Sequence, residues 1–476
     1  MIMKYLISIK QSETSLFIAT FSILTLTIFI HKILRVLKDT LVITDPNIGI
    51  QLIPFLKIWA FIPISIIVIK GVYILKNKYS YKTTYGITLA FFILSLSGYV
   101  FFIRSIETSL CPSTHYAMHL IPTYLQGFYL MLQYWPLSLF YVFCDLWPII
   151  MFSMLFWMYI DEIISLKQGK RFFPLYSIDI GGILLAPIVA LASYLSGGSW
   201  EIQLELLMGL VVILGIILWG LFNKLSQEYG VNPHAEQSKP SKNSKSWFKN
   251  SMQWRHYPFV IYLALIVFLF EFTDTIFDLL WKGILFEHIP SPGEFSTYLA
   301  NVSSVSGILA TLVALFFSTT LLRKLSWFRV AVIAPILFGL LSLCFFLSYF
   351  FPFLTAWLGT PFGMSALGVT VLIGAVQTCL MSTAKVTVFD NSKDLAFQLC
   401  NREERSFARG FANAFAMRTG KSASNLTYQI ASMTSANIIV ALPYLACIML
   451  MSIPAWLIGL SHISRQFVLR TAKEVP

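Results

Sequence analysis

Twelve mostly apolar stretches, each long enough to cross a bilayer as a helix, follow one another along the chain. A spanning helix needs about 20 apolar residues. Such stretches lie at 14–43, 51–75, 84–103, 131–159, 174–196, 203–223, 257–286, 296–320, 327–350, 364–391, 406–433 and 436–460. Only 12% of the residues are charged and 57% are hydrophobic, whereas soluble domains carry about 25% charged residues. We therefore predict an all-α, polytopic membrane protein with twelve transmembrane helices.

The loops between these stretches support the count of twelve. If both termini are cytoplasmic, 24 of the 34 Lys and Arg residues fall in inside loops, against Arg104 alone in the outside loops. Cytoplasmic loops of membrane proteins carry such an excess of Lys and Arg, and one missed helix would destroy the alternation. The net charge of +12 therefore reflects topology, and we expect no binding of nucleic acid.

A polar stretch rich in Lys and Ser divides the helices into two sets of six. We predict an N-terminal bundle at 1–223, a flexible cytoplasmic linker at 224–256 and a C-terminal bundle at 257–476. Short similarities relate the two halves: VLKDTL in the first helix resembles LWKGIL in the seventh, and FCDLW in the fourth resembles VFDNS in the tenth. Two six-helix halves around a site near the membrane midplane are a common plan of transporters.

Nine Lys and Arg residues remain in or near the predicted spans, and they are the main functional signal. They are Lys32, Arg35, Lys38, Lys57, Lys70, Lys282, Lys385, Arg418 and Lys421. Basic residues in a membrane are costly and face a cavity, a counter-ion or a ligand. Lys32, Arg35 and Lys38 are spaced by three and share one face of the first helix, and Asp39 is the only acidic residue beside them. This surplus of positive charge suits a multivalent anion such as phosphate. Lys32 and Lys70 lie near span ends, where we expect them to snorkel to the interface.

The seventh predicted helix carries a stripe of charged residues, Glu271, Asp274, Asp278 and Lys282. Asp278 and Lys282 are four residues apart and can form an ion pair. Glu271 and Asp274 have no such partner on the helix, which makes them candidates for proton coupling. The alternative is that they lie in water at the cytoplasmic mouth.

Two more carboxylates lie in apolar surroundings, Asp145 in the fourth helix and Asp179 near the start of the fifth. A lone carboxylate within a span rarely persists without a role, so Asp145 is a candidate for substrate binding and Asp179 for proton coupling. The seven His residues are scattered over span ends and loops. A membrane-bound enzyme would need a dense cluster of such groups, so we expect no enzymatic activity.

The cysteine pattern predicts neither a disulfide framework nor a metal site. The six Cys residues include no pair with the spacing of metal ligands. We expect no metal and no cofactor.

Six sequence blocks spread over essentially the whole chain carry a family resemblance. They are LKDTLVITDPNIGIQLIPFLKIWAFIP (37–63), FYVFCDLW (140–147), LFWMYIDEI with KRFFPLYSI (155–178), FDLLWKGIL (277–285), STAKVTVFDNSKDLAF (382–397) and RTGKSASNL (418–426). Together they resemble the nucleotide transporter family, the ATP/ADP translocases of plastids, obligate intracellular bacteria and microsporidia. The first and fifth blocks are the most specific.

The resemblance implies a major-facilitator-like fold and a carrier that exchanges ATP for ADP or imports nucleotides with protons. By motif, Lys38 corresponds to an essential lysine of the first signature, and Lys421 to the lysine of a GKSGG sequence. Asp145 and Asp278 stand where the family usually has Glu, in ELW and EVTWK sequences. With the basic residues in the spans, this gives a substrate site of Lys38, Arg35, Asp145, Asp278, Lys282, Lys385, Arg418 and Lys421.

Departures from the family pattern keep the mode of transport open. Both family glutamates are aspartates here, and GKSGG is replaced by GKSAS. We predict an alternating-access secondary transporter of nucleotides, working by exchange or with protons. It is expected as a monomer among membrane lipids in a bacterial inner membrane, with both termini cytoplasmic. The alternative is a proton-coupled carrier of another phosphorylated or organic anion.

Overall fold

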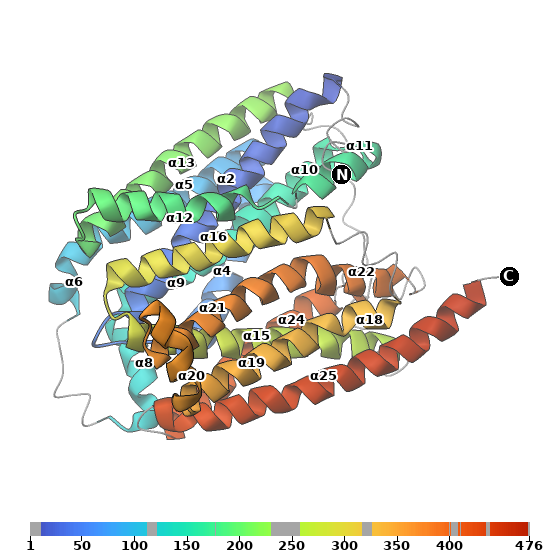
Figure 1. The fold of residues 1–476 in the computed structure, drawn as a ribbon. Coiled ribbons are helices and arrows are strands. Elements are labelled where there is room, and N and C mark those ends of the chain that lie inside the picture. The colour runs from blue at the N-terminus through green and yellow to red at the C-terminus, as the bar shows by residue number, and fades with distance from the viewer. Residues whose placement is uncertain are drawn as a thin grey trace. The chain divides into compact units, whose positions relative to one another are not determined.

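The computed structural model describes residues 11–111, 121–176, 178–229, 258–316, 326–398, 400, 408–409, 411–434 and 438–474. Every regular element in these residues is a helix, which confirms the predicted all-α class. The chain divides into two compact units (Figure 1): unit 1 is Met1–Pro233 with Leu285–Thr311, and unit 2 is His234–Ile284 with Leu312–Pro476. Most of the predicted linker at 224–256 lies outside the described residues.

Ten helices in the described residues are long and apolar enough to cross a membrane. They are Thr14–Ile43, Leu52–Lys78, Tyr81–Glu107, Trp135–Ile163, Trp200–Glu228, Phe259–His288, Pro292–Ala314, Trp327–Phe350, Ala366–Gln398 and Ala441–Gln466. Each of them overlaps one of the twelve predicted spans.

The other two predicted spans, 174–196 and 406–433, form different helices from those expected. The first is the shorter α12 (Ile180–Leu195), because the side chain of Asp179 caps its N-terminus by accepting a hydrogen bond of 2.9 Å from the Gly182 N–H. The second consists of η8 (Phe411–Ala416) and α24 (Met417–Thr434), and α24 is much more polar than the other predicted spans. A helix of this composition is suited to protein or water rather than to lipid.

Unit 1 is centred on α2, which packs against α9, η4, α12 and α13. Trp147 of α9 is fully buried, and its Nε1 donates a hydrogen bond of 3.1 Å to the Thr27 carbonyl of α2. The elements of this unit in chain order are η1 (Gln11–Glu13), α2 (Thr14–Ile43), α3 (Leu52–Phe55), η2 (Leu56–Ala60), α4 (Phe61–Lys78), α5 (Tyr81–Gly98), η3 (Tyr99–Ile103), α6 (Arg104–Leu110), α8 (Thr123–Gln133), α9 (Trp135–Trp147), η4 (Pro148–Phe156), α10 (Trp157–Ile163), α11 (Leu166–Tyr176), α12, α13 (Trp200–Glu228) and most of α16 (Pro292–Phe316).

Helix α16 lies beside α12 in unit 1 (Figure 1), although it follows the seventh span in sequence. The Ser304 hydroxyl donates to the Gly182 carbonyl at 2.7 Å and accepts from the Ala186 N–H at 2.8 Å. It thus bridges the acceptor and donor of one turn of α12. Gly307 allows this approach, because a Cβ there would lie 3.2 Å from the backbone nitrogen of Ile183.

Removal of this bridge has a measurable cost. We expect Ser304→Ala to lower the free energy of unfolding by about 1 kcal/mol, since two buried hydrogen bonds are lost and the helix turn recovers only part of them. Thermal unfolding of the detergent-purified protein measures this. Ser461→Ala is the matched control, because the hydroxyl of Ser461 makes a solvent-exposed hydrogen bond to the Ile458 carbonyl of its own helix. Equal shifts for both variants would contradict the expectation.

Helix α15 (Pro258–His288) belongs to unit 2 as far as Ile284. Trp281 of α15 is buried and donates a hydrogen bond of 3.2 Å from its Nε1 to the Val371 carbonyl. The other elements of this unit are α18 (Trp327–Ala331), α19 (Ile333–Phe350), α20 (Phe353–Gly359), η6 (Thr360–Phe362), α21 (Ala366–Ala384), η7 (Lys385–Phe389), α22 (Asp390–Gln398), η8, α24 and α25 (Ile438–Glu474). The packing of α15 against α21 and α24 brings together residues far apart in the sequence.

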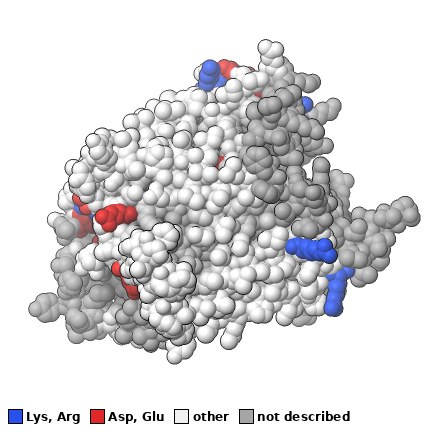
Figure 2. Space-filling model, in the orientation of Figure 1, with Lys and Arg blue, Asp and Glu red and all other residues white. Residues whose placement is uncertain are grey.

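The surface carries the signature of a protein that faces lipid. Figure 2 shows a face on which most described residues are uncharged, with few Lys, Arg, Asp or Glu side chains. Large apolar side chains are exposed, among them Tyr194 (82%), Leu94 (70%) and Ile67 (69%). Soluble monomers rarely expose apolar surface on this scale, whereas hydrocarbon accommodates it without cost.

Candidate functional site

The charged residues of unit 1 converge on Lys38 of α2. Its Nζ lies 2.6 Å from Asp39 Oδ1 and 3.2 Å from Asp145 Oδ1 of α9. The Tyr141 ring lies under the same ammonium, 4.0 Å from Nζ to the ring centre, and the Tyr141 hydroxyl donates to Asp39 Oδ1 at 3.5 Å. Lys38 is only 4% exposed, so one cation is sealed between two carboxylates and an aromatic face.

The role of Tyr141 was missed from the sequence. Tyr141 and Asp145 are four residues apart on one helix and therefore share a face, and that spacing was the available signal. The π-helical segment η4 begins three residues after Asp145. Such segments inside α-helices often accompany functional sites.

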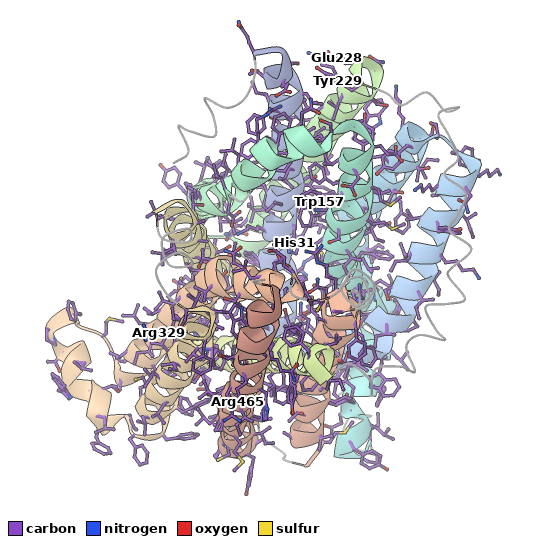
Figure 3. All side chains as sticks on the ribbon, turned by 90° about the vertical axis from the view of Figure 1, so that its right-hand side faces the viewer. His31, Trp157, Glu228, Tyr229, Arg329 and Arg465 are labelled. Carbon is purple, nitrogen blue, oxygen red and sulfur yellow. The ribbon has the colours of Figure 1, made fainter. Side chains whose placement is uncertain are left out.

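A second ion pair in unit 1 joins α2 to the start of α12. Lys32 Nζ donates to Asp179 Oδ2 at 2.6 Å, and both side chains are partly buried. The expectation that Lys32 only snorkels to the interface is wrong, because Asp179 gives it a nearby counter-ion within the protein. Arg35, between Lys32 and Lys38 on α2, is exposed. Figure 3 labels His31, the residue before Lys32 on the same helix.

In unit 2 the predicted pair on α15 is present. Lys282 Nζ lies 2.6 Å from Asp278 Oδ2, one helical turn away, and Lys282 is 5% exposed. The geometry is that of the i, i+4 pairing expected from the sequence. At two sites, therefore, an aspartate contacts a buried lysine: Asp145 with Lys38 and Asp278 with Lys282.

A further cluster in unit 2 combines α15, η7 and α24. Glu271 is 1% exposed; its Oε1 lies 2.7 Å from Lys385 Nζ and its Oε2 lies 3.4 Å from Lys421 Nζ. The ring centre of Phe270 lies 5.1 Å from Lys385 Nζ. Glu271 has no cation one turn away on its own helix, yet the fold provides two from other helices.

The remaining predicted residues lie near this cluster in sequence but outside its ion pairs. Asp274 is one turn after Glu271 on α15 and has no hydrogen bond or ion pair with the residues that the structure describes. Arg418 is one turn before Lys421 on α24, is exposed, and likewise has no ion pair within the described chain. Among the described residues, no group of His, Cys, Asp and Glu could hold a metal ion.

Helices long enough to span a membrane, with buried lysine–carboxylate pairs between and along them, are typical of a polytopic membrane carrier for a charged substrate. The comparisons agree. A family model described as TLC ATP/ADP transporter matches residues 1–467, and the chain belongs to this family. The resemblance seen in the sequence blocks is thereby confirmed, as is the prediction of a transporter rather than an enzyme.

Individual relatives support the same assignment, and a solved structure shares the fold. The ADP,ATP carrier protein 1 of Chlamydia pneumoniae is 28% identical over 465 residues, covering 93% of this chain and 90% of that protein. The chloroplastic ADP,ATP carrier protein 1 of Arabidopsis thaliana is 27% identical over 465 residues, covering 94% of this chain and 73% of that protein. A bacterial homologue of the iron transporter ferroportin, solved in an inward-facing state, matches with a TM-score of 0.59 and 14% identity over 96% of this chain and 100% of that one. This last likeness concerns the fold alone, which is of the major-facilitator type.

Proposed function

We propose that this protein is a secondary transporter of nucleotides that works by ATP/ADP-type exchange. The observation that carries the proposal is the pairing of Lys38 with Asp145 and of Lys282 with Asp278, at 3.2 and 2.6 Å. Each pair joins a lysine and a carboxylate of the family motifs. The ADP,ATP carriers among its relatives supply the substrate class.

The proposed mechanism is an exchange of ionic partners. A buried lysine without a counter-ion is costly, so the empty carrier holds each lysine with its own aspartate. The phosphates of a nucleotide offer stronger, charge-assisted hydrogen bonds to the same ammonium groups. Binding then releases the aspartates, and this difference between the empty and loaded states favours alternating access. Arg35, Lys385, Arg418 and Lys421 complete the proposed set of cations.

Proton-coupled import is the second candidate, and Asp274 favours it. This carboxylate is partly buried and has no ion pair among the described residues, so it is the freest of the three predicted proton-coupling groups to gain and lose a proton. Glu271 and Asp179 are held by lysines at 2.7 and 2.6 Å.

The same proposal includes the setting in the cell. The excess of basic residues in alternate loops favours cytoplasmic termini, and the bacterial relatives favour an inner membrane. We propose a monomeric carrier, since each unit of the single chain has its own ion-paired lysines.

Transport by cells that express the protein tests the proposal. We expect uptake of labelled ATP or ADP to rise severalfold when the cells or vesicles are preloaded with unlabelled nucleotide, because exchange needs an internal partner. A protonophore is expected to leave this uptake unchanged in preloaded vesicles. Uptake that ignores preloading and collapses with the protonophore would establish the proton-coupled mode, and competition by non-nucleotide organic anions alone would reject nucleotides as the substrate.

A further inference from the structure

We propose that Lys385 and Lys421 form a docking subsite for the oligophosphate group of the substrate, and that Glu271 occupies this subsite as a built-in competitor. The proposal rests on the proposed function and identifies the part of unit 2 that recognises the phosphates. It also gives Glu271 a role different from proton coupling.

The geometry of Glu271 is that of an internal anion held between two cations. Each of its oxygens faces one lysine, Oε1 at 2.7 Å from Lys385 and Oε2 at 3.4 Å from Lys421. Oε2 is buried and makes no hydrogen bond with the residues that the structure describes. The two carboxylate oxygens contact two ammonium groups, as two oxygens of a phosphate chain could do. The carboxylate, however, carries one negative charge, whereas the two lysines carry two positive charges.

Exposure indicates which lysine an incoming phosphate meets first. The side chain of Lys421 is 53% exposed and that of Lys385 is 29% exposed, whereas Glu271 is 1% exposed. Lys38 of unit 1, in contrast, is 4% exposed and already faces Asp39 and Asp145. In this conformation Lys385 and Lys421 of unit 2 are therefore accessible to a ligand, whereas Lys38 of unit 1 is buried.

The surroundings hold the subsite in place. The Phe270 ring lies 5.1 Å from Lys385 Nζ and stacks on Phe389 at 4.3 Å between ring centres. Lys421 is positioned by the residue before it, because a Cβ on Gly420 would lie 2.5 Å from the Phe268 carbonyl oxygen. Helix α24 thus approaches α15 closely at the point where Lys421 reaches Glu271.

The charge balance identifies the ligand class. Lys385, Lys421 and the exposed Arg418, one turn from Lys421, carry three positive charges. Glu271 and the neighbouring Asp274 carry two negative charges, so the group as a whole leaves one positive charge. A ligand with two linked phosphates matches this arrangement, since it can contact both ammonium groups at once and displace Glu271 from each. A single orthophosphate offers a smaller span and binds less tightly.

Binding of inorganic pyrophosphate to the full-length protein in detergent free of phospholipid tests the subsite without reference to transport. We expect pyrophosphate to bind more tightly than orthophosphate, and adenosine not to compete. Glu271→Gln removes the competing charge and is expected to tighten pyrophosphate binding about tenfold or more. Glu228→Gln is the matched control: Glu228 is the last residue of α13 (Figure 3) and its side chain is 43% exposed, so this variant is expected to leave pyrophosphate affinity unchanged.

A second variant guards against misfolding of Glu271→Gln, which leaves two lysines without their carboxylate. Lys421→Gln keeps the closer Lys385–Glu271 pair and is expected to weaken pyrophosphate binding about tenfold. If nucleotide uptake is normal but neither variant changes pyrophosphate affinity, the subsite is wrong and the proposed function stands. If both variants behave as expected but no nucleotide is transported, the proposed function is wrong and the subsite stands.

Discussion

Lys38→Ala is expected to abolish nucleotide uptake, with a loss of about 30-fold or more. Truncating one member of a buried, hydrogen-bonded charge pair costs about 2–5 kcal/mol, and about 1.4 kcal/mol corresponds to a factor of ten. Lys38 is the shared partner of Asp39 and Asp145, at 2.6 and 3.2 Å. Its removal takes away a proposed partner of the phosphates and leaves Asp39 and Asp145 without the cation that they share. Initial rates of labelled ATP uptake measure the effect.

The controls separate lost transport from lost protein. Lys38→Ala with Asp145→Asn removes one of the two stranded carboxylates, so this double variant is expected to regain folded protein in the membrane without regaining uptake. Lys224→Ala removes a lysine that is 74% exposed and is expected to leave uptake unchanged. Normal uptake by Lys38→Ala, with the protein present at its usual level, would remove Lys38 from the substrate site.

Gly420→Ala is expected to lower both stability and uptake. The added Cβ would lie 2.5 Å from the Phe268 carbonyl oxygen, and because this neighbour is backbone it cannot rotate away. Overpacking of this kind costs about 1–3 kcal/mol. If α24 instead moves away from α15, Lys421 loses its 3.4 Å contact with Glu271. Thermal unfolding and nucleotide uptake, measured on the same preparation, report the two consequences.

Another helical glycine supplies the control. Nothing lies within 4 Å of a Cβ placed on Gly71 of α4, so Gly71→Ala is expected to be neutral or to stabilise by about 0.5–1 kcal/mol through its higher helix propensity. If Gly420→Ala behaves in the same way, the close contact between α24 and α15 is not a requirement of the fold. The close approach of Phe268 accounts for the glycine before Lys421 by helix packing.

The ion pairs separate into those a sequence can predict and those it cannot. Asp278 and Lys282 lie four residues apart on one helix, so helical geometry alone brings them together, and they are 2.6 Å apart in the structure. Lys385 and Glu271 are 114 residues apart, and Lys32 and Asp179 are 147 residues apart. Their pairing depends on which faces of different helices pack together, and no local periodicity fixes that choice.

The sequence by itself determined the all-α membrane class, the approximate positions of the spans and the charged residues that lie in or near them. Transfer of a residue into hydrocarbon is a local property, and a long apolar stretch must therefore become a helix whatever surrounds it. Only the tertiary structure decided that Asp179 pairs with Lys32, that Tyr141 lies under Lys38, and that Glu271 stands between Lys385 and Lys421. These contacts join helices distant in the chain, and they depend on side-chain fit between packed surfaces, which a linear sequence pattern does not encode.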